Sequence, residues 1–159
     1  MKVLIIYDSV FGNTEKIAQA ISSSFGSKEN VETLRISDVK SEKLIGLNLL
    51  IVGSPTRAFR PTKAITNFLK KIPSNDLKGV KVAAFDTRIS TADMNSRLLN
   101  ILVKLFGYAA KPIADKLEKK GGSLIIPPEG FLVKESEGPL KDGQRERAAD
   151  WAKLIIKTQ

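Results

Sequence analysis

The fold of this chain is decided by residues 3–14, which read VLIIYDSVFGNT. The apolar run Val3–Tyr7 has the composition of a buried strand, and a helical pattern begins directly after the polar residues that follow it. A strand that turns sharply into a helix brings unpaired N–H groups and the positive end of the helix dipole to the turn. Gly12 leaves room for the backbone to approach a ligand, and further hydrogen-bonding groups come from Ser9, Asn13 and Thr14. The stretch predicts an anion site, and the alternative is an ordinary strand-to-helix turn capped by Asn13.

Further apolar runs follow, with helical patterns between them. The predicted strands are Val31–Ile36, Leu49–Gly53, Val80–Phe85 and Ser123–Ile126. They are rich in Val, Ile and Leu and barely alternate, which is typical of parallel strands covered on both faces. The predicted helices are Thr14–Phe25 with Gly26 as its C-terminal stop, a short turn at Ser41–Ile45, Pro61 to Pro73, Pro112–Lys120 and about Gln144–Lys157. This alternation predicts an α/β fold, a three-layer doubly wound sheet of five parallel strands in a single domain of residues 1–159.

The composition excludes several kinds of chemistry. The 159 residues include no cysteine and no histidine, which removes disulfides, thiol catalysis, the Ser-His-Asp arrangement and the commonest metal ligands. We therefore predict no metal site and no catalytic side chain, and expect any chemistry to come from a bound cofactor. The sequence has no apolar run long enough to span a membrane and no signal peptide, so a cytoplasmic location is predicted.

The chain is basic, with a formal net charge of +9 from 26 Lys and Arg against 17 Asp and Glu. Such a surface suggests an acidic partner, a nucleic acid, or a lysine-rich surface suited to heat or salt. The basic residues are spread along the chain without a run of five or six, so nucleic-acid binding is not predicted.

Ligands of doubly wound sheets bind beyond the carboxyl ends of the strands, where the strand order switches. The candidate site therefore lies in the loops Asp8–Asn13, Ser54–Arg60 and Asp86–Ser90. In the second loop Pro55 fixes the backbone, two hydroxyl residues flank it, and the ring of Phe59 stands between two arginines. This loop offers a planar anionic ligand both a stacking surface and charge. The alternative is that Phe59 packs inward over the following helix.

Together these loops resemble those of the flavodoxin family. The family's loop after strand one has the form Ser/Thr-x-Thr/x-Gly-x-Thr and wraps the phosphate of FMN; Ser9, Gly12, Asn13 and Thr14 fall on that pattern. The Gly-Ser-Pro-Thr opening at residues 53–56 matches the family's loop beside the isoalloxazine ring. The resemblance covers the whole chain in element order and length, and it implies strand order 2-1-3-4-5 and FMN as cofactor. The residues it implies at the cofactor are Ser9, Val10, Phe11, Gly12, Asn13, Thr14, Ser54, Pro55, Thr56, Arg57, Ala58, Phe59, Asp86, Thr87 and Arg88.

The chain departs from the family pattern around the ring. The segment Asp86–Ser90 has no Tyr or Trp and no glycine, and flavodoxins are typically acidic whereas this chain is basic. We expect Arg57, Arg60 and Arg88 around the ring, where a cation favours the anionic reduced flavin and raises the two-electron potential. The alternative for each arginine is a solvated surface charge.

The segment 91–106 is longer than a connection after the fourth strand requires, and most of its residues are apolar. Ser90 or Thr91 can cap a helix here, and only Arg97, Asn100 and Lys104 form a polar stripe. Three interpretations remain open: a wall over the ring, a surface for a homodimer or another partner, or ordinary core packing in a helical hairpin.

The resemblance implies an FMN-binding protein that carries electrons between redox partners, and the basic charge suggests partners with acidic docking surfaces. One alternative is an FMN-dependent NAD(P)H:quinone reductase-like enzyme. Another is a flavodoxin-like binding or scaffold domain that has lost the flavin, which the missing aromatic residue after the fourth strand would favour.

Overall fold

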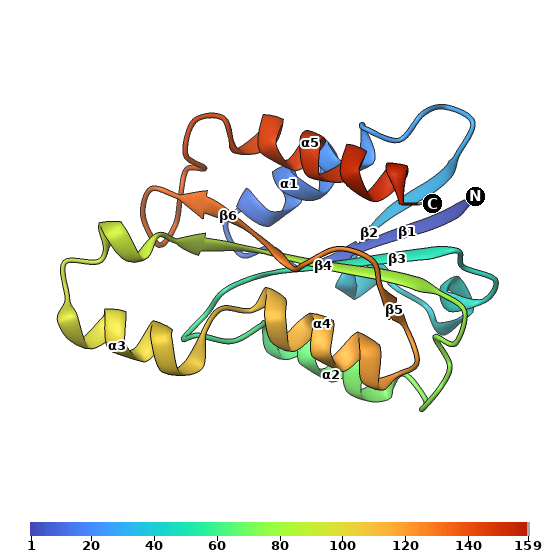
Figure 1. Cartoon of the computed structure of the whole chain (residues 1–159), viewed down its shortest axis with the longest axis horizontal. Coiled ribbons are helices and arrows are strands. Elements are labelled where there is room, and N and C mark those ends of the chain that lie inside the picture. The colour runs from blue at the N-terminus through green and yellow to red at the C-terminus, as the bar shows by residue number, and fades with distance from the viewer. Residues whose placement is uncertain (159) are drawn as a thin grey trace.

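A computed structural model describes residues 1–158. Its strands form one parallel sheet in the order β2-β1-β3-β4-β5, with β6 paired to β4 further along the same edge (Figure 1). The strands are β1 (Lys2–Tyr7), β2 (Asn30–Arg35), β3 (Leu49–Pro55), β4 (Lys81–Ile89), β5 (Ser123–Leu124) and β6 (Glu129–Val133). The predicted strand order and fold class are thereby confirmed.

Helices cover both faces of the sheet. Figure 1 shows α1 (Asn13–Ser22) and α5 (Gln144–Lys157) on one face, and α2 (Lys63–Lys71) and α4 (Ala110–Lys119) on the other. Because successive side chains of a strand point to opposite faces, the apolar residues of β1 contribute to two hydrophobic clusters, one on each face of the sheet. Val3, Ile5 and Tyr7 pack with Trp151 of α5 in one cluster, while Leu4 and Ile6 belong to the cluster that includes residues of α2 and α4.

The centre of the first cluster is aromatic. The rings of Phe85, Phe131 and Trp151 meet edge to face, with centroids 6.1 to 6.3 Å apart. The Phe85 ring lies directly over Gly53 of the neighbouring strand, where a Cβ would come within 2.1 Å of a ring atom. Gly53 is therefore required by the close approach of the Phe85 ring.

Two strands are longer than predicted. β4 continues from Phe85 to Ile89, so Asp86, Thr87 and Arg88 are strand residues and the predicted loop Asp86–Ser90 is wrong. The extension is stabilised from both sides, because β3 reaches Pro55 opposite Thr87 and β6 pairs with residues 85–89. Of the predicted fifth strand Ser123–Ile126 only Ser123–Leu124 forms a strand, β5, and β6 follows after residues 125–128, outside the predicted range.

The helices also differ from prediction at several ends. α1 ends at Ser22 instead of Phe25, because the hydroxyls of Ser23 and Ser24 donate to the carbonyls of Gln19 and Ala20, each at 2.9 Å. Gly26 does not terminate it in a left-handed conformation. The segment 91–106 is divided into the 3-10 turn η3 (Thr91–Asp93) and α3 (Arg97–Phe106), which begins where the Ser96 hydroxyl accepts the Leu99 N–H at 3.3 Å.

The connection after β2 consists of two 3-10 turns, η1 (Ile36–Asp38) and η2 (Ser41–Leu44), the second of which was predicted. α2 begins after Thr62, whose hydroxyl accepts the Ile65 N–H at 3.4 Å. Within residues 1–158 no helix is both long enough and apolar enough to cross a membrane.

Candidate functional site

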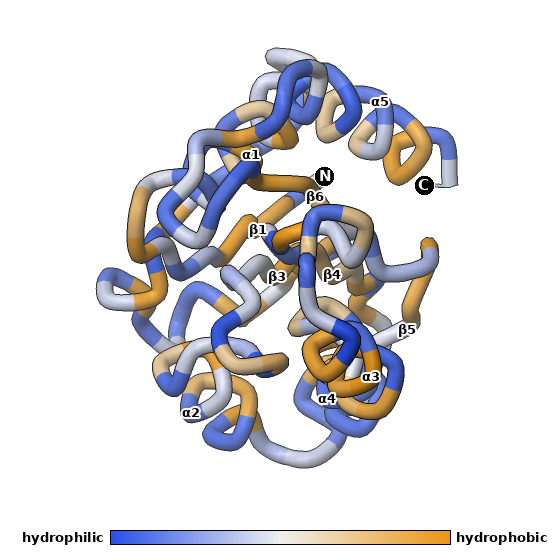
Figure 2. Tube along the Cα trace, turned by 90° about the vertical axis from the view of Figure 1, so that its left-hand side faces the viewer, coloured by the Kyte–Doolittle hydropathy of each residue, from blue (hydrophilic) through white to orange (hydrophobic). Residues whose placement is uncertain are grey.

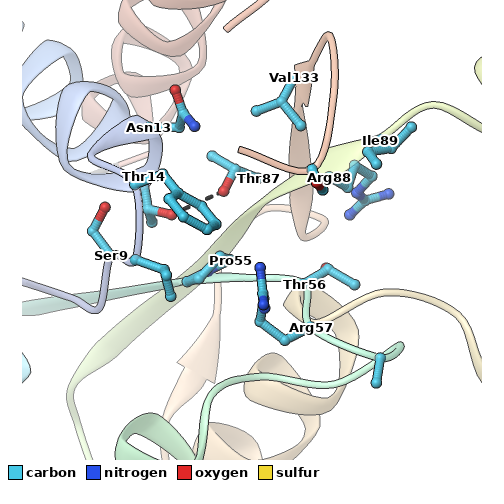
Figure 3. A pocket seen from close by; sticks show the side chains of 14 residues that line it. Ser9, Asn13, Thr14, Pro55, Thr56, Arg57, Thr87, Arg88, Ile89 and Val133 are labelled. Atoms are coloured by element: carbon cyan, nitrogen blue, oxygen red, sulfur yellow. Dashed lines mark hydrogen bonds between the residues drawn. The ribbon is translucent and has the colours of Figure 1, made fainter. Parts of the chain in front are cut away.

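A pocket of about 370 Å³ opens at the carboxyl edge of the sheet, between the turn from β1 to α1, the segment after β3 and the end of β4 (Figure 3). Its volume lies within the range of small-molecule sites. Eleven predicted residues line it: Ser9, Val10, Phe11, Asn13, Thr14, Pro55, Thr56, Arg57, Ala58, Thr87 and Arg88. Ile89, Val133 and Ser136 line it as well; none of them was among the predicted cofactor residues, although Ile89 belongs to the predicted segment 86–90.

One end of the pocket is suited to an anion. Gly12 adopts the left-handed conformation (φ +85°) before α1, and its N–H donates to the Ser9 hydroxyl oxygen at 3.0 Å. The hydrogen bonds within residues 1–158 provide no acceptor for the N–H of Asn13 or of Thr14. These donors stand at the positive end of the α1 dipole. The first-turn geometry therefore supports the predicted anion site.

Three hydroxyls accompany these N–H groups. Ser9 on the turn, Thr14 on α1 and Thr87 on β4 are all buried. The Thr14 and Thr87 hydroxyl oxygens lie 2.8 Å apart (dashed in Figure 3), which joins α1 to β4 at the pocket wall. The Ser9 oxygen accepts a hydrogen bond from Gly12, so its own proton remains available to a ligand.

Asn13 does not cap this turn. The residue before α1 is Gly12, and no side chain caps the helix there. The Asn13 amide nitrogen instead donates to the carbonyl of Glu137 at 3.0 Å, which ties the turn to the loop before α5. That tie brings Ser136 to the pocket.

The segment after β3 divides into residues that line the pocket and residues that support it. Thr56 and Ala58 line the pocket, whereas the Ser54 hydroxyl is buried and accepts the Thr62 N–H at 3.0 Å. The chain then reverses in a turn closed by two hydrogen bonds between Arg57 and Arg60, at 2.9 and 3.0 Å.

Phe59 points away from the pocket. Ala58 and Phe59 both have positive φ, +46° and +66°, which is uncommon for residues with a side chain. This turn directs the Phe59 ring against Phe106 at the end of α3, with centroids 6.2 Å apart. Phe59 therefore does not line the pocket, and its ring contacts Phe106 of α3.

The three arginines occupy different positions. Arg57 lines the pocket with its guanidinium carbon 5.6 Å from the centroid of the Phe11 ring, and it forms no ion pair with any of residues 1–158. Arg60 lies outside the pocket, in a groove beside Phe59. Arg88 lies at the pocket edge and is ion-paired with Asp86 at 2.5 Å. Figure 3 shows Arg57 below the pocket and Arg88 beside Ile89, away from Ser9.

Asp86 is fully buried and does not line the pocket. Burial raises the pKa of its carboxyl group above the ordinary value, and the Arg88 guanidinium and the Ala110 N–H oppose that rise. Tyr108 was not selected from the sequence, yet its ring lies 3.9 Å from the Arg88 guanidinium carbon. Burial also raises the pKa of Tyr108 above its ordinary value.

The sequence model of flavodoxins matches residues 5–151 of this chain, from the second half of β1 into α5. The chain belongs to the flavodoxin family. The flavodoxin of Maridesulfovibrio salexigens is 30% identical over 129 residues, covering 78% of this chain and 81% of that protein. The flavodoxin of Aquifex aeolicus is 25% identical over 166 aligned positions, covering 98% and 89%. A shorter match, 38% identical over 55 residues, spans 32% of the flavodoxin of Picosynechococcus.

Solved flavodoxin structures share the fold. A flavodoxin from the domain Archaea superposes with a TM-score of 0.77 at 23% identity, over 99% of both chains. Flavodoxin 1 of Bacillus cereus superposes with a TM-score of 0.79 at 21% identity, over 99% of this chain and 98% of that one. This flavodoxin is an FMN-binding electron carrier, and the comparisons favour neither a quinone reductase nor a domain without flavin.

Proposed function

We propose that FMN binds in the pocket of Figure 3, with its phosphate at residues 9–14 and its ring between residues 55–58 and 87–89. The observation that carries this proposal is the set of unpaired N–H groups of Asn13 and Thr14 beside three buried hydroxyls. Helix N-termini of this kind bind phosphate through backbone donors and the helix dipole. When bound, FMN supplies the redox chemistry, and the chain binds and orients it.

We further propose that three of the predicted cofactor residues support the pocket without contacting FMN. Ser54 fixes the start of the next loop through Thr62, and Phe59 anchors that loop to α3. Asp86 lies behind the wall and holds Arg88. The remaining predicted residues face the cofactor or, in the case of Gly12, shape the turn beside it.

Among the arginines, Arg57 is the residue we propose as the cation that acts on the ring, because it lines the pocket without a carboxylate partner. Replacing Arg57 by Gln is expected to weaken the binding of reduced FMN relative to oxidised FMN by about fivefold, since an exposed charge is screened by solvent. The two affinities are measured by anaerobic titration of the apoprotein with each form of FMN.

Arg60→Gln is the matched control, because Arg60 is also exposed and lies three residues away outside the pocket. We expect it to leave the ratio of the two affinities within about twofold of the original. An equal change in both variants would mean that overall charge, and not the position of Arg57, sets the ratio.

We propose α3 as the surface that docks a redox partner. Most of its apolar side chains are exposed, with Leu98 66%, Leu105 71% and Phe106 59% exposed, and among its residues only Val103 is buried. Figure 2 shows α3 as a mostly hydrophobic coil, and Figure 1 shows that it lies beyond the end of α4. Exposed apolar patches of this kind usually mark interaction sites.

The partner we propose is a protein with an apolar patch bordered by acidic residues. Beside Phe59 and Phe106, a groove of about 450 Å³ is lined by four cations and one carboxylate: Arg60, Lys70, Lys116, Lys119 and Asp115. Complementary charge favours an acidic partner, whereas a second copy of a chain with a net charge of +9 would be repelled. Because Phe106 touches the loop that carries Ala58, a protein docked on α3 would also lie next to the pocket.

Leu105→Glu tests this surface. A reductase with an acidic docking face is expected to reduce the FMN-loaded protein at a rate that falls with salt and drops at least about tenfold in the variant. Leu154→Glu is the matched control, because Leu154 is a leucine of α5 that is 52% exposed. A rate unchanged by Leu105→Glu would contradict the proposal. A dimer in sedimentation that Leu105→Glu dissociates would assign α3 to a second copy.

The cytoplasmic location remains a prediction from the sequence.

A further inference from the structure

An ion pair joins Arg88 in the wall of the pocket to a buried carboxylate behind it. The Asp86 side chain has no exposed surface, and its two oxygens accept from Arg88 Nε at 2.5 Å and from Arg88 Nη2 at 2.7 Å. Asp86 Oδ2 also accepts the N–H of Ala110, at 2.7 Å, at the start of α4. Bidentate pairs of this kind fix both the charge and the direction of the guanidinium.

The Arg88 guanidinium has two further close neighbours. The centroid of the Tyr108 ring lies 3.9 Å from its carbon, and the Tyr108 hydroxyl donates to the carbonyl of Ile89 at 3.3 Å. Gly130 of β6 is the second, where a Cβ would come within 2.2 Å of the guanidinium. A larger residue at position 130 would therefore displace the Arg88 side chain.

We infer that Asp86 keeps Arg88 electrically neutral toward the flavin, and thereby sets how much positive charge the ring encounters. The inference rests on the proposed FMN site, whose wall includes Arg88 and Ile89. Opposite charges 2.5 Å apart largely cancel at the distance of a neighbouring ligand, whereas a lone guanidinium with 21% exposure would act on it strongly. Asp86 is thus a positioning residue that acts through Arg88, and Arg57 is left as the effective cation.

The test compares Asp86→Asn, Arg88→Gln and the double variant by anaerobic titration of each apoprotein with oxidised and with reduced FMN. Asp86→Asn leaves Arg88 uncompensated, so reduced FMN is expected to gain about tenfold over oxidised FMN. That ratio corresponds to a rise of about 30 mV in a two-electron potential. Asparagine keeps an oxygen for the Ala110 N–H, and far-UV circular dichroism reports whether the fold is kept.

Arg88→Gln separates this inference from a free-cation role for Arg88. A buried carboxyl group that has lost its cation takes up a proton, so the site stays neutral and the ratio of affinities should remain within about threefold of the original. The double variant should also keep the ratio of affinities within about threefold of the original. If Asp86→Asn does not fold, Arg88→Gln still tests the inference. If Arg88 acted as a free cation, its replacement by Gln would shift the ratio of affinities about tenfold toward oxidised FMN.

Two failures are distinguishable. The inference would be overturned, and the proposed function would stand, if every variant bound reduced and oxidised FMN with the original ratio of affinities. The same holds if Arg88→Gln lowered the affinity for reduced FMN relative to oxidised FMN, as a free cation requires. Absence of FMN binding by the unaltered protein would overturn the proposed function and this inference with it.

Discussion

The double replacement of Ser9 by Ala and Thr14 by Val is expected to weaken FMN binding about 100-fold and riboflavin binding less than about threefold. Each hydroxyl faces the end of the pocket where the first-turn N–H groups of α1 are unpaired. A hydrogen bond to a charged group contributes about 1.5–3 kcal/mol, so two lost bonds to phosphate account for a change of this size. Riboflavin lacks the phosphate, so its affinity should change little. Fluorescence titration of the apoprotein with each ligand measures both effects.

The control for this variant is Ser23→Ala. The Ser23 hydroxyl bonds the Gln19 carbonyl at 2.9 Å, at the opposite end of α1, so the replacement tests whether loosening the helix alone changes binding. We expect Ser23→Ala to change neither affinity by more than about twofold. Equal losses of FMN and riboflavin in the double variant would show that residues 9–14 do not hold the phosphate.

Gly53→Ala is expected to destabilise the protein by about 3 kcal/mol, because overpacking a tight core forces side chains out of their favoured positions. A Cβ at position 53 would lie 2.1 to 2.5 Å from three atoms of the Phe85 ring. That ring cannot withdraw easily, since it is fully buried and packs against Phe131 and Trp151. Urea unfolding of the apoprotein, followed by far-UV circular dichroism, measures the free energy of unfolding.

Gly26→Ala is its matched control, because nothing lies within 4 Å of a Cβ at that glycine and its φ is not positive. We expect a change below about 0.5 kcal/mol there. Unfolding of Gly53→Ala at the urea concentration of the original protein would contradict the packing described for the sheet centre.

The fold was predictable where hydropathy alone decides burial. The run Val3–Tyr7 is almost wholly inside, and the last helix has the bounds expected from its spacing, Gln144–Lys157. The end of β4 was not predictable in this way, because Asp86 is buried by its ion pair and not by an apolar side chain. β6 was missed because it begins with Glu129 and Gly130 and pairs with that same unrecognised part of β4.

The phosphate end of the site was easier to predict than the ring end. Residues 9–14 follow from a strand that turns into a helix, which is local in the sequence. The positions of Phe59 and Arg88 depend on distant contacts, with Phe106 for the first and with Tyr108 for the second. One indication was available: Asp86 and Arg88 are two residues apart, so on a strand they share a face and can pair.

The central claim, that this flavodoxin holds FMN in the pocket at residues 9–14, is tested most directly by the visible absorption spectrum after FMN addition and desalting. We expect the flavin bands to stay with the protein at about one FMN per chain, as a pocket lined by backbone and hydroxyl donors requires. Protein that elutes colourless, with all FMN in the salt fraction, would contradict the claim.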